Sequence, residues 1–221
     1  MLEIGSVFGP YRLQAVLGRG GMGMVYEATQ LSLDRVVALK VVAPGLSADQ
    51  GFRARFRREG PMQARIDHPH IVPVYEAGTC AHGLFVAMQL IRGETLAEVL
   101  ARGAPAQPAV LTALTQIAGA LDAAHEVGLA HGWLRPEAVL IDEGGRAWLS
   151  DFGLSPGAAT VSADRAAFAK LVRTCLGKRV VPRGKWETAS ELVAAAAARL
   201  HGSADRDAWR RRVRRWVAPR R

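Results

Sequence analysis

Cysteine is scarce in this chain, and long hydrophobic runs are missing. Its two cysteines, Cys80 and Cys175, cannot by themselves form a disulfide framework or a zinc site. No stretch approaches the roughly eighteen apolar residues of a membrane span, and the chain does not open on a secretory pattern. We therefore expect a soluble protein of the reducing cytoplasm.

An excess of charge of one sign is also missing from most of the chain. The net charge is +9, but residues 206–221 alone contain eight arginines and one aspartate. The remainder is nearly neutral. This distribution argues against a nucleic-acid-binding face on the fold and confines the basic character to the C-terminal end. With 49% hydrophobic residues in 221, the chain is too apolar for a disordered linker and long enough for one large core or two lobes.

The segment from Arg206 to Arg221 has the pattern of a basic amphipathic helix ended by Pro219. Its apolar residues recur at helical spacing: Trp209, Val213, Trp216 and Val217. Three interpretations stay open. The first is a last helix docked on the domain. The second is a helix at an anionic membrane surface, which would place the protein at the inner face of the membrane. The third is a binding element for an acidic protein or nucleic acid.

Strands dominate the first ninety residues. Apolar and polar residues alternate over residues 11–17 and 23–30, on either side of a glycine cluster, which predicts a hairpin. Residues 35–42, 71–75 and 84–90 are further strand candidates. One helix is expected over residues 49–64, capped by Ser47 and kinked or ended by Pro61, because a proline inside a helix lacks the N–H that it should donate.

Helices dominate after Gly93. Residues 108–128 place apolar side chains three and four positions apart, the spacing of a helix that packs on a core. Two apolar runs, 139–141 and 147–149, predict a small hairpin around Gly144 and Gly145. Residues 163–176 and 189–200 are helical by composition and period. The whole pattern favours an α+β fold.

A glycine-rich loop separates the first two expected strands. Residues 18–25 read G-x-G-x-x-G-x-V, and the missing side chains would let backbone N–H groups close over phosphates. By itself the loop is equally compatible with a glycine-rich turn. Further along, Lys40 lies on an apolar strand, where its ammonium could reach phosphates, and Asp151 precedes Phe152 and Gly153, where its carboxylate could hold a hard cation.

In this order, the glycine-rich loop, the strand lysine and the Asp-Phe-Gly motif resemble the protein kinases. Residues 8–11 (FGPY), 19–23 (RGGMG) and 68–72 (HPHIV) are most similar to bacterial serine/threonine kinases of the actinobacterial type. The resemblance is close from Phe8 to about Gly153. It implies a bilobal kinase-like fold with a β-rich N-lobe at residues 1–91, a reduced helical C-lobe at 92–201 and a basic segment at 202–221.

The resemblance also implies a nucleotide site. Its members would cover the phosphates, sandwich the adenine, pair with the phosphates or form the hinge: Leu17, Gly18, Gly20, Gly23, Val25, Ala38, Lys40, Glu59, Met88, Gln89, Ile91 and Leu140. Lys40 would pair with Glu59 as well as with phosphate, unless Pro61 leaves Glu59 exposed on its helix. Asp151 would coordinate magnesium.

The catalytic loop departs from the family's pattern, His-Arg-Asp-Leu-Lys-Pro-Glu-Asn, because residues 131–138 read HGWLRPEA. Trp133 replaces the carboxylate that orients the substrate hydroxyl and accepts its proton, and an indole can do neither. Ala138 replaces the asparagine that holds a second metal ion. His131 is expected to pack beneath the Asp-Phe-Gly motif, and Asp142 lies too far along the chain to act as the base. No catalytic residue is therefore assigned.

The region after Gly153 is short. Ten residues separate it from Asp164, where the next helix is expected, and no Ala-Pro-Glu motif follows. The sequence therefore predicts a truncated pseudokinase that binds ATP, with one magnesium ion at most, and serves as a signalling scaffold or regulator. The alternative is an atypical serine/threonine kinase of low activity.

A protein partner is expected for such a scaffold, either a phosphothreonine-reading domain or a partner kinase. The hydroxyls of Ser155, Thr160 and Ser162, in the short segment after the Asp-Phe-Gly motif, are candidate phosphorylation sites. A reduced C-lobe would leave apolar surface that a second copy could cover, so a dimer is a further expectation.

Overall fold

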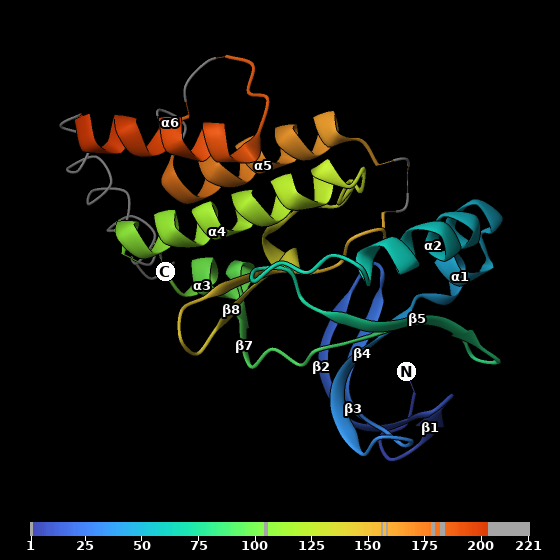
Figure 1. The fold of residues 1–221 in the computed structure, drawn as a ribbon. Coiled ribbons are helices and arrows are strands. Elements are labelled where there is room, and N and C mark those ends of the chain that lie inside the picture. The colour runs from blue at the N-terminus through green and yellow to red at the C-terminus, as the bar shows by residue number, and fades with distance from the viewer. Residues whose placement is uncertain are drawn as a thin grey trace, which may run out of the picture. The chain divides into compact units, whose positions relative to one another are not determined.

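The computed structural model describes residues 2–103, 106–155, 157, 159–177, 180–181 and 184–202 (Figure 1). The chain divides into two compact units. The first comprises Met1–Asp67, Val72–Ile91 and Phe152–Ala158, and the second comprises His68–Ile71, Arg92–Asp151 and Ala159–Arg221. The connection into the second unit therefore falls at Ile91, and the segment after Asp151 returns to the first.

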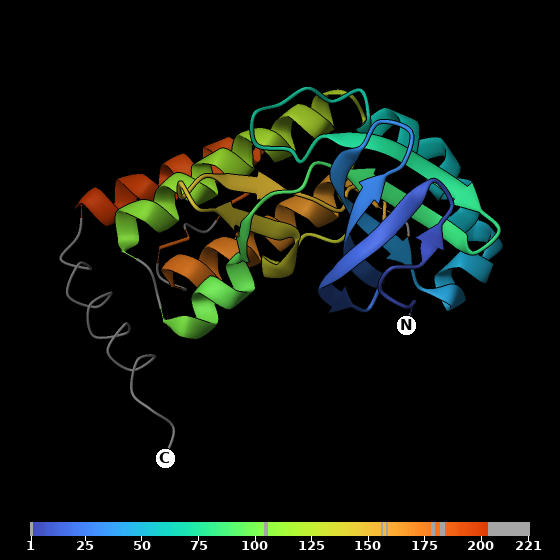
Figure 2. The same cartoon turned by 90° about the horizontal axis from the view of Figure 1, so that it is seen from below.

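The first unit is built on a six-stranded antiparallel sheet with the order β1-β2-β3-β4-β6-β5. Its strands are β1 (Val7–Phe8), β2 (Tyr11–Gly20), β3 (Gly23–Gln30), β4 (Arg35–Val42), β5 (Val74–Cys80) and β6 (Gly83–Met88). The predicted hairpin and the third strand are confirmed. Figure 2 shows the sheet strongly curled, and two register shifts between β2 and β3 contribute to that bend.

One face of this sheet carries the core of the unit. Strand residues alternate between faces, and the buried apolar cluster takes every second position of neighbouring strands, together with Phe8 of β1: Phe8, Tyr11, Leu13, Tyr26, Ala28, Val37, Leu39, Phe85 and Ala87. Aromatic edge contacts reinforce it, with the ring centroids of Tyr11 and Phe85 5.4 Å apart. The intervening positions consequently point to the opposite face.

Helix α2 (Gln50–Gln63) differs from its prediction at both ends. Asp49 is its cap, since a carboxylate oxygen of Asp49 accepts a hydrogen bond from the Phe52 N–H at 2.6 Å. The expected cap, Ser47, lies within the short helix α1 (Pro44–Ala48), too early in the chain to reach those N–H groups. Pro61 does not break α2, which continues to Gln63 before it ends.

The strand expected over residues 71–75 is wrong by several positions. Strand β5 begins only at Val74, after Pro73. Ile71 and Val72 are buried, and Ile71 makes an isolated parallel bridge to Leu149. The apolar run therefore marks a buried connecting segment as much as a strand. The other predicted member of the pair is confirmed as β6.

The second unit combines a small sheet with helices. Strands β7 (Gly93–Thr95), β8 (Val139–Asp142) and β9 (Ala147–Leu149) form the sheet in that order. The helices are α3 (Leu96–Arg102), α4 (Gln107–Glu126), the 3-10 turn η1 (Pro136–Ala138), α5 (Val161–Leu176) and α6 (Ala189–Gly202). The predicted hairpin and the three long helices are confirmed, while β7 and α3 were not predicted.

Helices α4, α5 and α6 pack side by side (Figure 1). Leu114, Ile117 and Leu121 of α4 are almost fully buried, as the spacing of apolar residues in this segment predicts. A carboxylate fixes where α6 begins, because Asp122 of α4 accepts hydrogen bonds from the backbone N–H groups of Ala189 and Ser190. The first turn of α6 is thus tied to the C-terminal part of α4.

No helix among the described residues is long and apolar enough to cross a membrane. The predicted basic amphipathic helix falls on residues 206–221, outside the described residues.

Candidate functional site

Several predicted nucleotide-site residues share the sheet face opposite the core. Directly paired residues of antiparallel strands point to the same side. Val25 pairs with both Gly18 and Lys40, and Ala38 pairs with Met88. Ala38, Lys40 and Met88 are buried, and Val25 is partly buried. The register thus brings these five positions onto one surface, where an apolar rim lies beside one ammonium group.

The glycine-rich loop contains glycines of two kinds. A Cβ on Gly23, at φ +142°, would lie 2.0 Å from the carbonyl oxygen of Val41, so the sheet itself requires glycine there. A Cβ on Gly18 would meet nothing within 4 Å. The fold therefore gives no steric reason for a glycine at position 18. A ligand that approaches the backbone closely would give such a reason. Gly20 pairs with Gly23 at the hairpin end, and Leu17 is half-exposed.

Glu59 faces inward on α2. Its side chain is 13% exposed, and a Cβ on Gly153 would lie 3.1 Å from its own Cβ, so the two residues are in contact. Pro61 therefore does not turn Glu59 outward. The Glu59 carboxylate pairs with Arg58 at 2.6 Å, and its pairing with Lys40 stays a prediction.

The hinge residues follow β6. The Gln89 N–H donates to the carbonyl of Pro73 at 2.9 Å, so a ligand contact at Gln89 would fall to its carbonyl oxygen. Ile91, the last residue of its segment of the first unit, is partly buried. Leu140 belongs to the second unit, where it pairs with Thr95 and Trp148 in the small sheet and is partly buried.

Asp151 ends the second unit's central segment in an unusual backbone conformation. Its φ is +70°, one of two positive values among the described non-glycine residues, and its side chain is largely buried. Such conformations persist only where the surroundings hold them, and they concentrate at functional sites. The preceding residue is fixed in the second unit, since the N–H and hydroxyl of Ser150 both donate to the carbonyl of Ala138.

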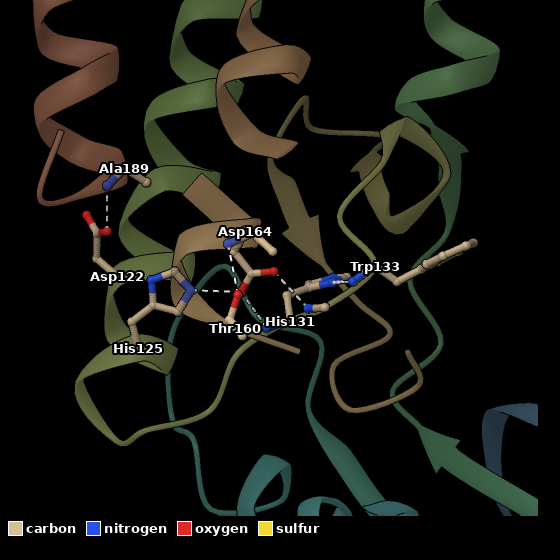
Figure 3. Close-up of polar contacts among 9 residues, drawn as sticks. Asp122, His125, His131, Trp133, Thr160, Asp164 and Ala189 are labelled. Carbon is tan, nitrogen blue, oxygen red and sulfur yellow. Dashed lines mark hydrogen bonds and ion pairs between the residues drawn. The ribbon is translucent and has the colours of Figure 1, made fainter. Parts of the chain in front are cut away.

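The loop that begins at His131 is anchored by a buried carboxylate, Asp164, in the first turn of α5 (Figure 3). Asp164 is 1% exposed. It accepts hydrogen bonds from the backbone N–H groups of His131 at 2.6 Å and Gly132 at 2.8 Å, and its Oδ2 lies 2.9 Å from His125 Nε2. Burial opposes ionisation of Asp164, but these hydrogen bonds outweigh it and lower its pKa.

Both ring nitrogens of His131 have partners. Nε2 lies 2.8 Å from the carbonyl oxygen of Ser150 and must donate to it, while Nδ1 accepts from the Trp133 N–H at 3.2 Å. In a neutral ring this pattern places the proton on Nε2. With no exposed surface, His131 is a structural residue, which agrees with the packing role predicted for it.

Trp133 is the residue that the sequence predicts in place of a catalytic carboxylate. Its side chain is 37% exposed and points away from the Asp164 cluster (Figure 3). The Arg135 guanidinium lies 5.5 Å from its ring centroid. Ala138 is fully buried and takes part only through its backbone. Neither residue can supply a base or a metal ligand.

Asp142 is engaged in the hairpin turn between β8 and β9. One oxygen accepts from the N–H groups of Gly144 and Arg146, and the other accepts from Trp148 Nε1 at 3.0 Å. The Trp148 hydrogen bond is the largest cause of a lowered pKa at Asp142. Both oxygens of the Asp142 carboxylate are thus engaged in the turn, which agrees with the prediction that Asp142 does not act as the base.

The three candidate phosphorylation sites differ in access. Ser155 is buried and its hydroxyl accepts from the Gly157 N–H, so the folded chain does not present it to a kinase. The Thr160 hydroxyl caps α5 by accepting from the Ala163 N–H. Ser162 is exposed.

Among the described residues no group of three histidine, cysteine, aspartate or glutamate side chains could hold a metal ion, so Asp151 remains a single candidate ligand.

Comparisons with known proteins agree with this architecture. A family model described as "Protein kinase domain" matches residues 11–174. The serine/threonine-protein kinase PknE of Mycobacterium bovis is 44% identical over 152 residues, 68% of this chain and 27% of that protein. PknD of Mycobacterium tuberculosis is 45% identical over 154 residues, 69% of this chain and 23% of that protein. The chain thus matches about a quarter of each curated relative.

A solved structure extends the match. The crystal structure of a double mutant of the Mycobacterium tuberculosis PknI kinase domain has a TM-score of 0.81 at 27% identity. The alignment takes in 90% of this chain and 100% of that one, so the short helical unit has a counterpart of similar extent. The predicted kinase-like fold, with a β-rich N-lobe and a helical C-lobe, is confirmed.

Proposed function

Because this chain belongs to the protein kinase family, in its serine/threonine branch, we propose that it is a pseudokinase: a domain that binds nucleotide without transferring phosphate and acts as a signalling scaffold. Trp133 carries the proposal. The loop around it keeps the hydrogen bonds that hold it in place, yet the side chain at the reacting position has no group that accepts a proton.

The neighbouring groups offer no substitute for the missing base. The ring nitrogens of His131 and the oxygens of Asp142 are all engaged in the fold. Glu137 is the remaining carboxylate of the loop. It is 54% exposed, and Arg135 Nε lies 3.8 Å from it. A low-activity kinase, the second candidate function, would depend on Glu137.

Nucleotide binding is supported by the sheet face described above. Lys40 would pair with phosphates there, and Gly18 would let the backbone approach them, for which its open surroundings leave room. Asp151 would hold one magnesium ion at most, because Ala138 contributes no side-chain ligand. Magnesium bound with ATP would neutralise phosphate charge. The chain's own residues would only bind and orient the nucleotide.

A transfer assay with labelled ATP, on the chain itself and on a generic protein substrate, tests the proposal. We expect no transfer above that of Lys40→Ala. We expect the double variant Trp133→Asp/Ala138→Asn to gain transfer, because the loop is already held in position. Transfer by the wild type that Lys40→Ala abolishes and Trp133→Asp does not change would refute the pseudokinase. In that case Glu137→Gln should abolish it.

Calorimetric titration separates nucleotide binding from inertness. We expect ATP to bind, more tightly with magnesium than without, and Asp151→Asn to remove the magnesium effect while it leaves binding of free ATP. If ATP releases no heat either with or without magnesium, the chain does not bind nucleotide, and the proposal is reduced to a scaffold without a ligand.

We infer a protein partner for this scaffold, and we propose that the basic C-terminal segment places the domain at an anionic membrane surface. Each basic residue near such a surface contributes about 1 kcal/mol. Sedimentation with vesicles of phosphatidylglycerol and of phosphatidylcholine tests the membrane idea. Equal binding to both lipids would contradict it.

A further inference from the structure

A large basic groove lies in the second unit, in a part of the fold that nucleotide binding does not use. It has a volume of about 1170 Å³ and is lined by α5, the first turns and the far end of α6, and residues just before α6. Its lining residues on α5 run from Ser162 to Arg173, which corresponds to a length of roughly 16 Å at 1.5 Å per residue. These dimensions suit a peptide segment of several residues.

The charge of the groove is strongly one-sided. Four basic side chains, Arg165, Arg173, Lys185 and Arg199, line it against a single carboxylate, that of Glu187. Within the described residues none of these four bases forms an ion pair, and the Nε of Arg165 is buried without a hydrogen-bond partner. A buried donor without a partner costs free energy. An anionic ligand would satisfy it.

The floor of the groove is apolar. Phe168 and Leu192 are buried beneath it, and Trp186 is partly buried against Gly184, with the ring about 3.6 Å from a Cβ placed there. Tryptophan and arginine are the residue types that most often dominate binding energy at protein interfaces. A flat bilayer or a nucleic-acid backbone would not fill such a concave floor, whereas apolar side chains of a peptide would.

We propose that this groove binds an acidic peptide segment of a partner protein, with its carboxylates on the arginines and an apolar side chain against Trp186. The chain's own basic end, residues 206–221, is excluded as the occupant by its positive charge. A second copy is disfavoured for the same reason, because the whole chain carries +9.

Fluorescence anisotropy with the full chain tests the groove. The probe is a fluorescein-labelled twelve-residue peptide in which six glutamates alternate with leucine and phenylalanine, and its matched control has glutamine in place of glutamate. The test variant is Arg173→Gln/Arg199→Gln, two exposed positions at which folding is not at risk. The charge-matched control is Arg57→Gln/Lys170→Gln, also exposed but outside the groove.

We expect the acidic peptide to bind, the glutamine peptide to bind at least tenfold more weakly, and the test variant to lose about tenfold in affinity, while the control variant stays within twofold. Trp186→Ala should also weaken binding. Equal losses in the two double variants would assign the binding to the basic end and overturn the proposal. So would an absence of binding, or equal binding of the two peptides. Phosphatidylglycerol vesicles that bind in place of the peptide, and lose affinity in the test variant, would assign the groove to a membrane.

Discussion

Removal of the Asp164 carboxylate should destabilise the second unit strongly. In Asp164→Ala the backbone N–H groups of His131 and Gly132 lose their acceptor, and His125 loses its partner. A buried donor left unsatisfied costs about 1 to 3 kcal/mol. Two such donors give about 2 to 6 kcal/mol, a large part of the roughly 5 to 15 kcal/mol by which a typical domain is stable.

Urea denaturation at pH 7, followed by circular dichroism, measures this loss. An unchanged dependence on urea concentration would show that the same surface unfolds in both proteins. Asp164→Asn should lie between wild type and Asp164→Ala, because its amide oxygen still accepts one or two of the bonds. Ser162→Ala, an exposed change in the same turn, is the control and should be nearly neutral. An Asp164→Ala protein within 1 kcal/mol of wild type would refute the anchoring role.

Three further predictions concern the same fold. The pKa of Asp164 is lowered in the folded protein, so its contribution to stability is present above the unfolded carboxyl pKa of about 3.9 and is lost as pH falls through the lower folded pKa. Melting temperatures measured between pH 2 and 5 should therefore fall more steeply for wild type than for Asp164→Asn. Parallel curves would contradict this. Asp122→Ala should cost about 1 kcal/mol in urea denaturation, because α6 loses its cap, and an unchanged midpoint would count against that role. Gly23→Ala should lower the melting temperature by several degrees, because the added Cβ would collide with the carbonyl of Val41. Gly18→Ala should leave the melting temperature unchanged and weaken ATP binding in calorimetry. A larger loss of melting temperature in Gly18→Ala than in Gly23→Ala would overturn the distinction between the two glycines.

The sequence predicted those parts of the fold that have strong periodicity. Helices α4, α5 and α6 and strands β2, β3 and β4 follow from spacing and strand propensity alone. The start of β5 did not, because Ile71 and Val72 are apolar for burial in a connecting segment. Helix α3 did carry a local signal, since Thr95 and Glu98 form a reciprocal cap at its start.

The candidate site was predicted unevenly for a physical reason. Motif residues such as Lys40 and Asp151 can be found by spacing, because their neighbours in the chain are fixed. Asp164 could be placed on a helix but not in a network, since its partners lie more than thirty positions away. The pairing of Glu59 with Arg58 was unpredictable in the same way, because it depends on side-chain directions.

The anchoring of the loop at His131 has a consequence for how such a domain changes over time. Its hydrogen bonds to α5 come from the main-chain N–H groups of His131 and Gly132, and the Trp133 N–H donates to His131 within the loop, so the side chain at position 133 adds little to these hydrogen bonds. Natural selection for a stable protein would then be almost blind to that side chain. Exchange of an aspartate for tryptophan could spread without a penalty in folding, and the opposite exchange could return just as easily.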